Sequence, residues 1–204
     1  MDDVAMKIIS NSVKFAWHYT PAMGMAGIMD TGTIRPSTVD IGPAERPAAW
    51  FSLNQRIELT MTETAFETRD GRCIRPRNLE EYRILGFGLY RVGVCPSRLL
   101  RYVDLLKAAK IGLVRRKVLE RIARNVGATP SEWMGHIGAV EIQPDMPIER
   151  FDGKAWVPSA LKRGASLPLL MDEANLIKPL TEALLNNQKR SDKKPIKSDR
   201  LFCF

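Results

Sequence analysis

Residues 15–53 constrain the fold most, because their prolines and glycines divide the stretch into short regular pieces. An apolar segment over 15–20 predicts a β-strand, and residues 22–30 predict a short helix that ends at a glycine. A proline-containing loop then leads to a second predicted strand over 48–53. This order places His18 at a strand end beside a loop, where rigid strands often hold ligand-binding side chains.

The rest of the chain continues with short strands and helices in mixed order. Strands are predicted over 84–94, 139–143 and 148–157, helices over 54–68 and 96–127, and a polar loop over 69–80. Gly112 is expected to divide the longer helix, and the Asp152-Gly153 pair suits a tight turn. This pattern predicts an α+β fold in a single domain over 1–186, followed by a basic, mobile tail over 187–204.

Composition and motifs argue against several classes of protein. No run of the 204 residues approaches the about 20 apolar residues of a membrane helix, and the start of the chain is acidic where a signal peptide is basic. The three cysteines lack C-x-x-C spacing, which indicates reduced thiols in a cytoplasm and no metal site. There is no G-x-G-x-x-G, Walker A, H-E-x-x-H or serine-elbow motif, so a Rossmann oxidoreductase, a P-loop NTPase, a zincin and a serine hydrolase are unsupported.

The positive charge of the chain is concentrated in two segments. The formal net charge is +8, and residues 98–124 contain nine Lys and Arg against two acidic residues, while residues 189–200 contain six against two. Such segments on a nearly neutral body predict a polyanionic partner, most simply DNA or RNA. A solvated tail and a helix with a basic outer face explain the same charges, and so does an acidic surface on a protein acceptor.

Three short motifs in 15–53 resemble the ADP-ribosyltransferase superfamily. They are His18-Tyr19-Thr20, then the run Ile28-Met29-Asp30-Thr31-Gly32-Thr33-Ile34-Arg35-Pro36, and finally Ala49-Trp50-Phe51-Ser52. Their order and spacing are similar to the outline "H-[YF]-T … I-[LM]-x-x-G-x-I-x-P … A-x-[WYF]-F-S" of that superfamily. The histidine in the first strand resembles the branch that includes the poly-ADP-ribose polymerases and the DarT-type DNA-modifying toxins. The resemblance implies an ADP-ribosyltransferase-like core of two split sheets with flanking helices.

The resemblance also implies NAD as a substrate and assigns a role to several residues. It makes Glu141 and His18 the catalytic residues, because the run from Ala139 to Ile148 is similar to the strand that carries the catalytic glutamate in DarT-type enzymes. Glu149 is the alternative acid. The NAD-binding residues implied are His18, Tyr19, Thr20, Arg35, Trp50, Phe51 and Ser52, with Arg91 as a further candidate. His136 is interpreted as structural or surface-exposed, and Gln143 replaces the second acid of the arginine-modifying E-x-E pair.

The leading hypothesis is an NAD-dependent ADP-ribosyltransferase that modifies a nucleic acid or a protein, such as a toxin of a bacterial or phage conflict system. Two alternatives stay open. The first is a non-catalytic basic binding protein or inhibitor with the same fold, which would be favoured if Glu141 pointed away from His18. The second is an NAD-dependent RNA 2′-phosphotransferase, a family that uses several arginines around its histidine, whereas only Arg35 is obviously near here.

Overall fold

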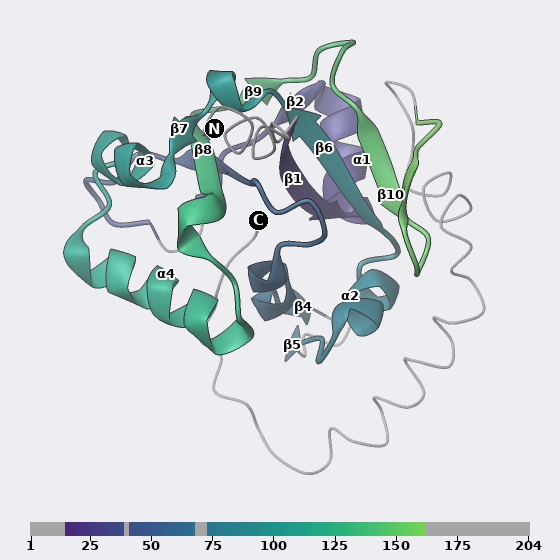
Figure 1. The fold of residues 1–204 in the computed structure, drawn as a ribbon, viewed down its shortest axis with the longest axis horizontal. Helices are drawn as coiled ribbons and strands as arrows, with labels where there is room; N and C mark the ends of the chain where they lie inside the picture. The colour runs from purple at the N-terminus through teal and green to yellow at the C-terminus, as the bar shows by residue number, and fades with distance from the viewer. Residues whose placement is uncertain (1–14, 39–40, 68–72, 162–204) are drawn as a thin grey trace, which may run out of the picture.

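A seven-stranded antiparallel sheet forms the centre of the fold (Figure 1). The computed structural model describes residues 15–38, 41–67 and 73–161. The strands of the sheet are, in spatial order, β11 (Trp156–Pro158), β10 (Ile148–Phe151), β6 (Leu89–Val94), β1 (Ala16–Pro21), β3 (Ala48–Ser52), β8 (Trp133–Ile137) and β7 (Leu100–Arg101). The first strand of the described chain therefore lies in the middle of the sheet, between β6 and β3.

Four helices and two small ribbons complete the described part of the fold. The helices are α1 (Ala22–Thr31), α2 (Leu79–Leu85), α3 (Tyr102–Ala108) and α4 (Leu113–Val126), with short 3₁₀ turns η2 (Leu59–Glu63), η3 (Pro96–Arg98) and η4 (Pro130–Glu132). The ribbons pair β2 (Thr33–Ile34) with β9 (Val140–Glu141), and β4 (Phe66–Glu67) with β5 (Cys73–Ile74). The α+β prediction is confirmed, while the split two-sheet arrangement stays a prediction.

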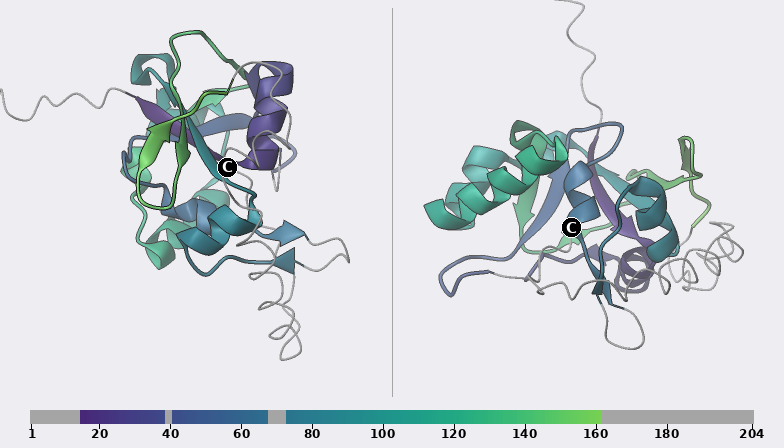
Figure 2. Two further views of the ribbon diagram at one scale, coloured as in Figure 1. Left: turned by 90° about the vertical axis from the view of Figure 1, so that its right-hand side faces the viewer. Right: turned by 90° about the horizontal axis from the view of Figure 1, so that it is seen from below.

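The two faces of the sheet carry different sets of side chains, because residues alternate along each strand. On one side, which we call the α1 face, apolar residues of β1, β6 and β3 pack against α1 and against Ile34 and Val140 of the β2–β9 ribbon. On the opposite side, the η2 face, Trp17 and Tyr19 pack against Met61 of η2 and residues of α2 and β11. In the left view of Figure 2, the purple helix α1 lies to the right of β1 and β6, and η2 and α2, in blue, lie below these strands.

A third cluster joins α3 and α4 to the far end of the sheet around Trp133 of β8. Gly135, two residues further along β8, lies where α3 approaches the strand most closely. A methyl group at this position would meet Leu105 Cδ2 at 2.5 Å and the Ala49 carbonyl oxygen at 2.9 Å. The small size of Gly135 therefore allows α3 to pack on β8.

We expect Gly135→Ala to destabilise the protein by about 1–3 kcal/mol, the usual range for an overpacked core. The backbone oxygen of Ala49 cannot move without disturbing the pairing of β3 with β8. Urea unfolding of Gly135→Ala measures the effect, with Gly42→Ala as the control, because a methyl group built there meets only the Glu45 side chain, at an ordinary contact distance of 3.5 Å. Equal stability of the two variants would contradict this account of the packing.

Several elements confirm the predicted boundaries closely. The predicted pieces over 15–20, 22–30 and 48–53 correspond to β1, α1 and β3. Helix α1 ends at Gly32, whose left-handed backbone (φ 70°) lets its N–H bond to the Ile28 carbonyl oxygen. The helix predicted over 96–127 is confirmed in part: Gly112 does divide it into α3 and α4, but its first residues form η3 and the edge strand β7 instead. The predicted strand over 148–157 is a hairpin of β10 and β11.

The helix predicted over 54–68 is wrong. The structure has a turn at Asn54, the 3₁₀ segment η2, and then β4. Asn54 Oδ1 accepts the backbone N–H groups of Arg56 and Ile57, which is turn geometry and not the start of a long helix. The buried Glu58 side chain binds both the backbone N–H and the hydroxyl of Thr60, which fixes the short 3₁₀ turn. These local side-chain bonds compete with helix formation and outweigh the apolar periodicity.

Three further segments differ from the prediction. Helix α2 replaces the end of the predicted polar loop and the beginning of the predicted strand over 84–94. The Asn78 side chain caps this helix by accepting the Glu81 N–H. The strand predicted over 139–143 is reduced to the two residues of β9. Strand β8 was not predicted, since its Gly-His sequence lacks apolar alternation. The domain end at 186 and the tail over 187–204 lie outside the described residues.

Candidate functional site

His18 lies at the centre of the sheet, and its side chain is buried on the α1 face. Its ring packs against Phe51, with ring centres 5.7 Å apart. Its Nδ1 lies 3.0 Å from the Trp50 carbonyl oxygen, to which it donates when protonated at that nitrogen. Burial lowers the pKa of His18 below 6.5, and the hydrogen bond to Trp50 opposes this shift only in part. The imidazole is therefore neutral near pH 7 and ties β1 to β3.

A buried neutral histidine makes the protein less stable in mild acid. Because the folded-state pKa of His18 lies below its unfolded value of about 6.5, the unfolded chain binds the proton more readily. The contribution of neutral His18 to the free energy of unfolding is complete above about pH 6.5. It falls as the pH drops towards the folded pKa, by at most about 1.4 kcal/mol per pH unit. Urea unfolding at several pH values should show this slope, and His18→Gln should lose it. If the slope disappears in His136→Gln and not in His18→Gln, the effect comes from His136 and the prediction is wrong.

Tyr19 and Thr20, the next two residues of the motif, are buried on opposite faces of β1. Thr20 shares the α1 face with His18, and its hydroxyl donates to the Pro21 carbonyl oxygen at 3.4 Å. Tyr19 lies on the η2 face, where its hydroxyl donates to the Asn54 carbonyl oxygen at 2.7 Å. Because the sheet separates the two side chains, a single ligand pocket does not contact both.

The residues of the third motif, Ala49 to Ser52, are divided in the same way. Trp50 packs edge-on against Trp133 in the α3–α4 cluster, with ring centres 6.3 Å apart, whereas Phe51 belongs to the α1 face. Ser52 is buried, and its Oγ accepts the Asn54 backbone N–H at 3.1 Å. Trp50 and Ser52 therefore act in packing and in a turn.

Arg35 is exposed, and its guanidinium lies over α1 beside Gly27. The predicted NAD-binding residues are thus distributed among the α1 face, the η2 face, the α3–α4 cluster and the surface. Within the described part of the chain they do not line one common cavity.

Glu141, the predicted catalytic acid, lies on the outer side of the β2–β9 ribbon. Its neighbour Val140 is buried in the core of the α1 face, so the exposed Glu141 side chain points away from it. Glu141 lines a pocket of about 190 Å³ together with Arg98 and His136. The Nδ1 of His136 is buried and has no hydrogen-bond partner among the described residues. The structure thus brings Glu141 beside His136, whereas His18 does not line that pocket.

The alternative acid, Glu149, forms an ion pair with Arg91 on the η2 face. Glu149 of β10 and Arg91 of β6 are cross-strand neighbours. Nε and Nη2 of Arg91 donate to Oε2 of Glu149 at 2.7 and 2.5 Å, and Nη1 donates to the Gln55 carbonyl oxygen at 2.7 Å. The side chain of Arg91 is 7% exposed and that of Glu149 is 22% exposed. The guanidinium is therefore enclosed, while solvent reaches the carboxylate.

Two tryptophan rings contact the Arg91 guanidinium. Its Cζ lies 3.9 Å from the ring centre of Trp17 and 4.3 Å from that of Trp156, within range of a cation–π interaction. Nε1 of Trp17 donates to the Gln55 side-chain oxygen at 2.9 Å, and Nε1 of Trp156 donates to the Arg56 carbonyl oxygen at 2.6 Å. These bonds fix both indoles around the cation.

Tyr19 completes this group of side chains. Its ring meets that of Trp156 edge-on, with ring centres 5.5 Å apart. Burial raises the pKa of Tyr19 to about 12, although the neighbouring Arg91 guanidinium opposes the shift, so the phenol stays protonated at neutral pH. We call the set the Arg91 cluster, and its members are Trp17, Tyr19, Arg91, Glu149 and Trp156.

The Arg91 cluster combines three chemical capabilities. A carboxylate can stabilise developing positive charge, a guanidinium can bind phosphate oxygens, and indole rings can stack on a planar heterocycle. Sequence reasoning ranked Arg91 and Glu149 second and did not single out Trp17 or Trp156. The available signal was a single charged residue, Arg91, in the otherwise uncharged segment that forms β6; β10 gave no such signal, because Glu149 is followed by Arg150.

Comparisons with known proteins place no constraint on this site. No family model, no curated protein and no solved structure matches the chain. Among the described residues, none of the helices has the length and apolar character needed to cross a membrane, and no cluster of His, Cys, Asp and Glu has the geometry of a metal site. The candidate site therefore depends on the geometry of the Arg91 cluster itself.

Proposed function

We propose that the protein is an NAD-dependent ADP-ribosyltransferase whose reaction centre is the Arg91 cluster, with a nucleic acid or a protein as the acceptor. The observation that supports this most is the solvent-accessible Glu149 carboxylate, held beside a guanidinium and two indole rings. Strand β1, which carries the His18-Tyr19-Thr20 motif, contributes Trp17 and Tyr19 to this cluster. In this proposal the motif strand supplies the site through its η2 face, and His18 supports the strand from the opposite face.

The reaction breaks the bond between the anomeric carbon of a ribose and the nicotinamide nitrogen of NAD. The electron pair of that bond neutralises the pyridinium ring, and positive charge develops on the ribose. Glu149 would stabilise this charge and take the proton of the acceptor group as its new bond to the anomeric carbon forms. Arg91 binds Oε2 of Glu149, and among the described residues no hydrogen bond engages Oε1, which is the atom we assign to this role.

The remaining members of the cluster would bind and orient the substrate. Arg91 holds the Glu149 carboxylate in place through its Nε and Nη2 donors. Trp156 is only partly buried, so its ring could provide stacking surface for a planar ring, while the buried Trp17 supports the guanidinium from the other side. The protonated Tyr19 hydroxyl donates to the Asn54 carbonyl oxygen, so Tyr19 positions the ring of Trp156 and does not itself contact the substrate.

The direct test is nicotinamide release from NAD by the purified full-length protein. The assay is run alone and with single-stranded DNA, duplex DNA, RNA or a mixed protein acceptor. Release above the background hydrolysis of NAD would support the proposal, and stimulation by one of these polymers would identify the acceptor class. Absence of release by folded protein, together with no change in its melting temperature when NAD is added, would refute the proposal.

A non-catalytic binding protein with the same fold is the second candidate. It is favoured by the outward direction of Glu141 and by the burial of His18 away from the pocket that Glu141 lines. Such a protein would give no nicotinamide release but would keep its affinity for a polyanion. The assay above and the binding experiment below therefore separate the two candidates.

A further inference from the structure

Helix α4 presents a row of cations at the end of the molecule remote from the Arg91 cluster. Three basic residues are exposed on its outer side: Lys117, Arg121 and Arg124. Leu119 and Ala123, on its inner side, are buried in the α3–α4 cluster around Trp133. Figure 2 shows α4 at the opposite end of the body from the β10–β11 hairpin, which carries Glu149 and Trp156. We call Lys117, Arg121 and Arg124 the α4 cation row.

The structure distinguishes these cations from the other basic residues of α4. Arg115 is paired with Glu45 at 3.3 Å, and Arg116 is paired with Glu120 at 2.7 Å. Within the described residues, no carboxylate lies at ion-pair distance from any member of the α4 cation row. The charge of these three residues is therefore available to a partner, whereas that of Arg115 and Arg116 is largely neutralised within the fold.

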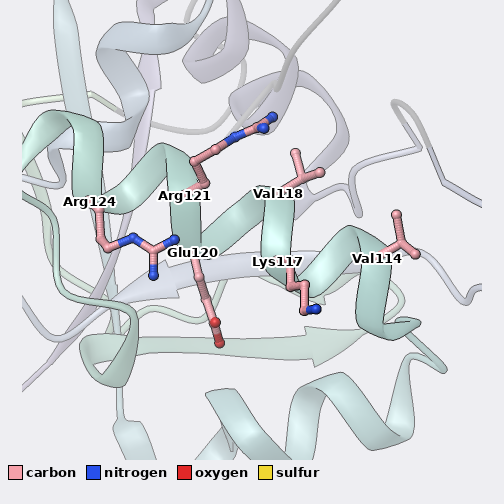
Figure 3. Close-up of a pocket in the computed structure, with 6 residues that line it drawn as sticks. All are labelled: Val114, Lys117, Val118, Glu120, Arg121 and Arg124. Carbon is pink, nitrogen blue, oxygen red and sulfur yellow. The ribbon is translucent and has the colours of Figure 1, made fainter.

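The surface around the row is hollowed and partly apolar. A pocket of about 550 Å³ is lined by Lys117, Arg121 and Arg124 together with Val114, Val118 and Glu120 (Figure 3). Val114 is 81% exposed and the adjacent Leu113 is 64% exposed, so the start of α4 adds apolar area to this surface. The exposed Lys107 and Lys110, at the end of the adjacent α3, add further positive charge near this surface.

We propose that the α4 cation row binds the sugar–phosphate backbone of a nucleic acid strand. The first and last of the three cations are seven positions apart, about 10 Å along the helix at 1.5 Å per residue, which is the axial length of roughly three nucleotides at about 3.4 Å each. Three unpaired cations at this spacing match a regular row of phosphates, and the methyl groups of Val114 and Val118 provide apolar area for the sugars. The inference does not depend on transferase activity, because it concerns binding in the absence of NAD.

The test is the salt dependence of binding to a fluorescently labelled 20-nucleotide strand, measured by anisotropy as the single strand and as the duplex. Arg121→Gln/Arg124→Gln is compared with Arg56→Gln/Lys154→Gln, which removes the same charge from exposed residues near the β10–β11 hairpin. Each lost phosphate contact reduces the slope of log K against log salt by about 0.7 to 0.9. We therefore expect a reduction of about 1.4 to 1.8 for the α4 variant and a much smaller one for the control. The basic segment over 189–200 contributes equally to both variants, so the comparison removes its effect.

Three results would overturn the inference. The first is the absence of salt-dependent binding to either form of the strand. The second is an equal change of slope in the two variants, which would mean that only net charge matters. The third is displacement of the strand by polyglutamate at least as effectively as by unlabelled strand, which would indicate an acidic protein surface as the partner. Near-UV circular dichroism of both variants checks that the fold is retained.

Discussion

Replacement of Glu149 by glutamine is expected to lower nicotinamide release at least about 100-fold, the usual effect of removing one electrostatic group from a reaction centre. Glutamine keeps the shape of the side chain and can still accept a hydrogen bond from Arg91, but it loses the negative charge that would face the ribose. The rate constant under saturating NAD measures the effect. The same variant is unfolded in urea, so that a loss of activity is not mistaken for a loss of structure.

Two other glutamates make this experiment specific. Glu141→Gln tests the acid that the sequence resemblance favours, and it should reduce release much less than Glu149→Gln if the Arg91 cluster is the reaction centre. Glu81→Gln removes an ion-paired glutamate on α2 and controls for charge alone. A large loss in Glu141→Gln with normal activity in Glu149→Gln would move the reaction centre to the pocket that contains His136 and Arg98.

Replacement of Arg91 by leucine is expected to destabilise the fold by about 3 kcal/mol. Loss of one partner from a buried ion pair typically costs about 3–5 kcal/mol, and the lower value applies here because Glu149 is 22% exposed. The Gln55 carbonyl oxygen loses a donor as well, and both tryptophans lose their contact with the cation. Guanidinium chloride unfolding followed by tryptophan fluorescence measures the change.

The control for this prediction is Arg77→Ala on α2. Arg77 forms an ion pair with Glu81, but its side chain is 59% exposed, so its loss should change the free energy of unfolding much less than the loss of Arg91. Similar effects of the two substitutions would show that the Arg91–Glu149 pair is worth no more than a surface pair. That result would also weaken the case that the cluster is pre-organised for a ligand.

Local patterns were sufficient to predict the elements whose ends are marked by glycine or proline. Gly32 ends α1 because its left-handed backbone (φ 70°) suits glycine, and Gly112 marks the start of α4, where it is the N-cap residue. The helix prediction for the segment after Asn54 was wrong because local side-chain bonds oppose helix formation there. The side chains of Asn54 and Glu58 bind nearby backbone N–H groups and replace the helix that the apolar spacing indicated.

The candidate site could be predicted only in part, since motif proximity does not determine which way a side chain points. His18 and Tyr19 are adjacent in the motif, yet strand alternation directs them to opposite faces of the sheet, and that alternation was readable from the sequence. The pairing of Arg91 with Glu149 was not, because the two residues are 58 positions apart and meet only when β6 and β10 align. No local pattern specifies that register.

The position of β1 in the middle of the sheet has a consequence for synthesis on the ribosome. His18 lies opposite Val92, and its strand cannot obtain that neighbour until β6 has left the exit tunnel. The contacts of Arg91 with Glu149 and Trp156 form only after those two residues have been translated, much later in the chain. A nascent chain ending before residue 148 would expose the edge of β6 that β10 later covers and would leave Arg91 without its carboxylate partner. Such a topology, dominated by distant contacts, favours slow folding and dependence on chaperones that shield incomplete sheets.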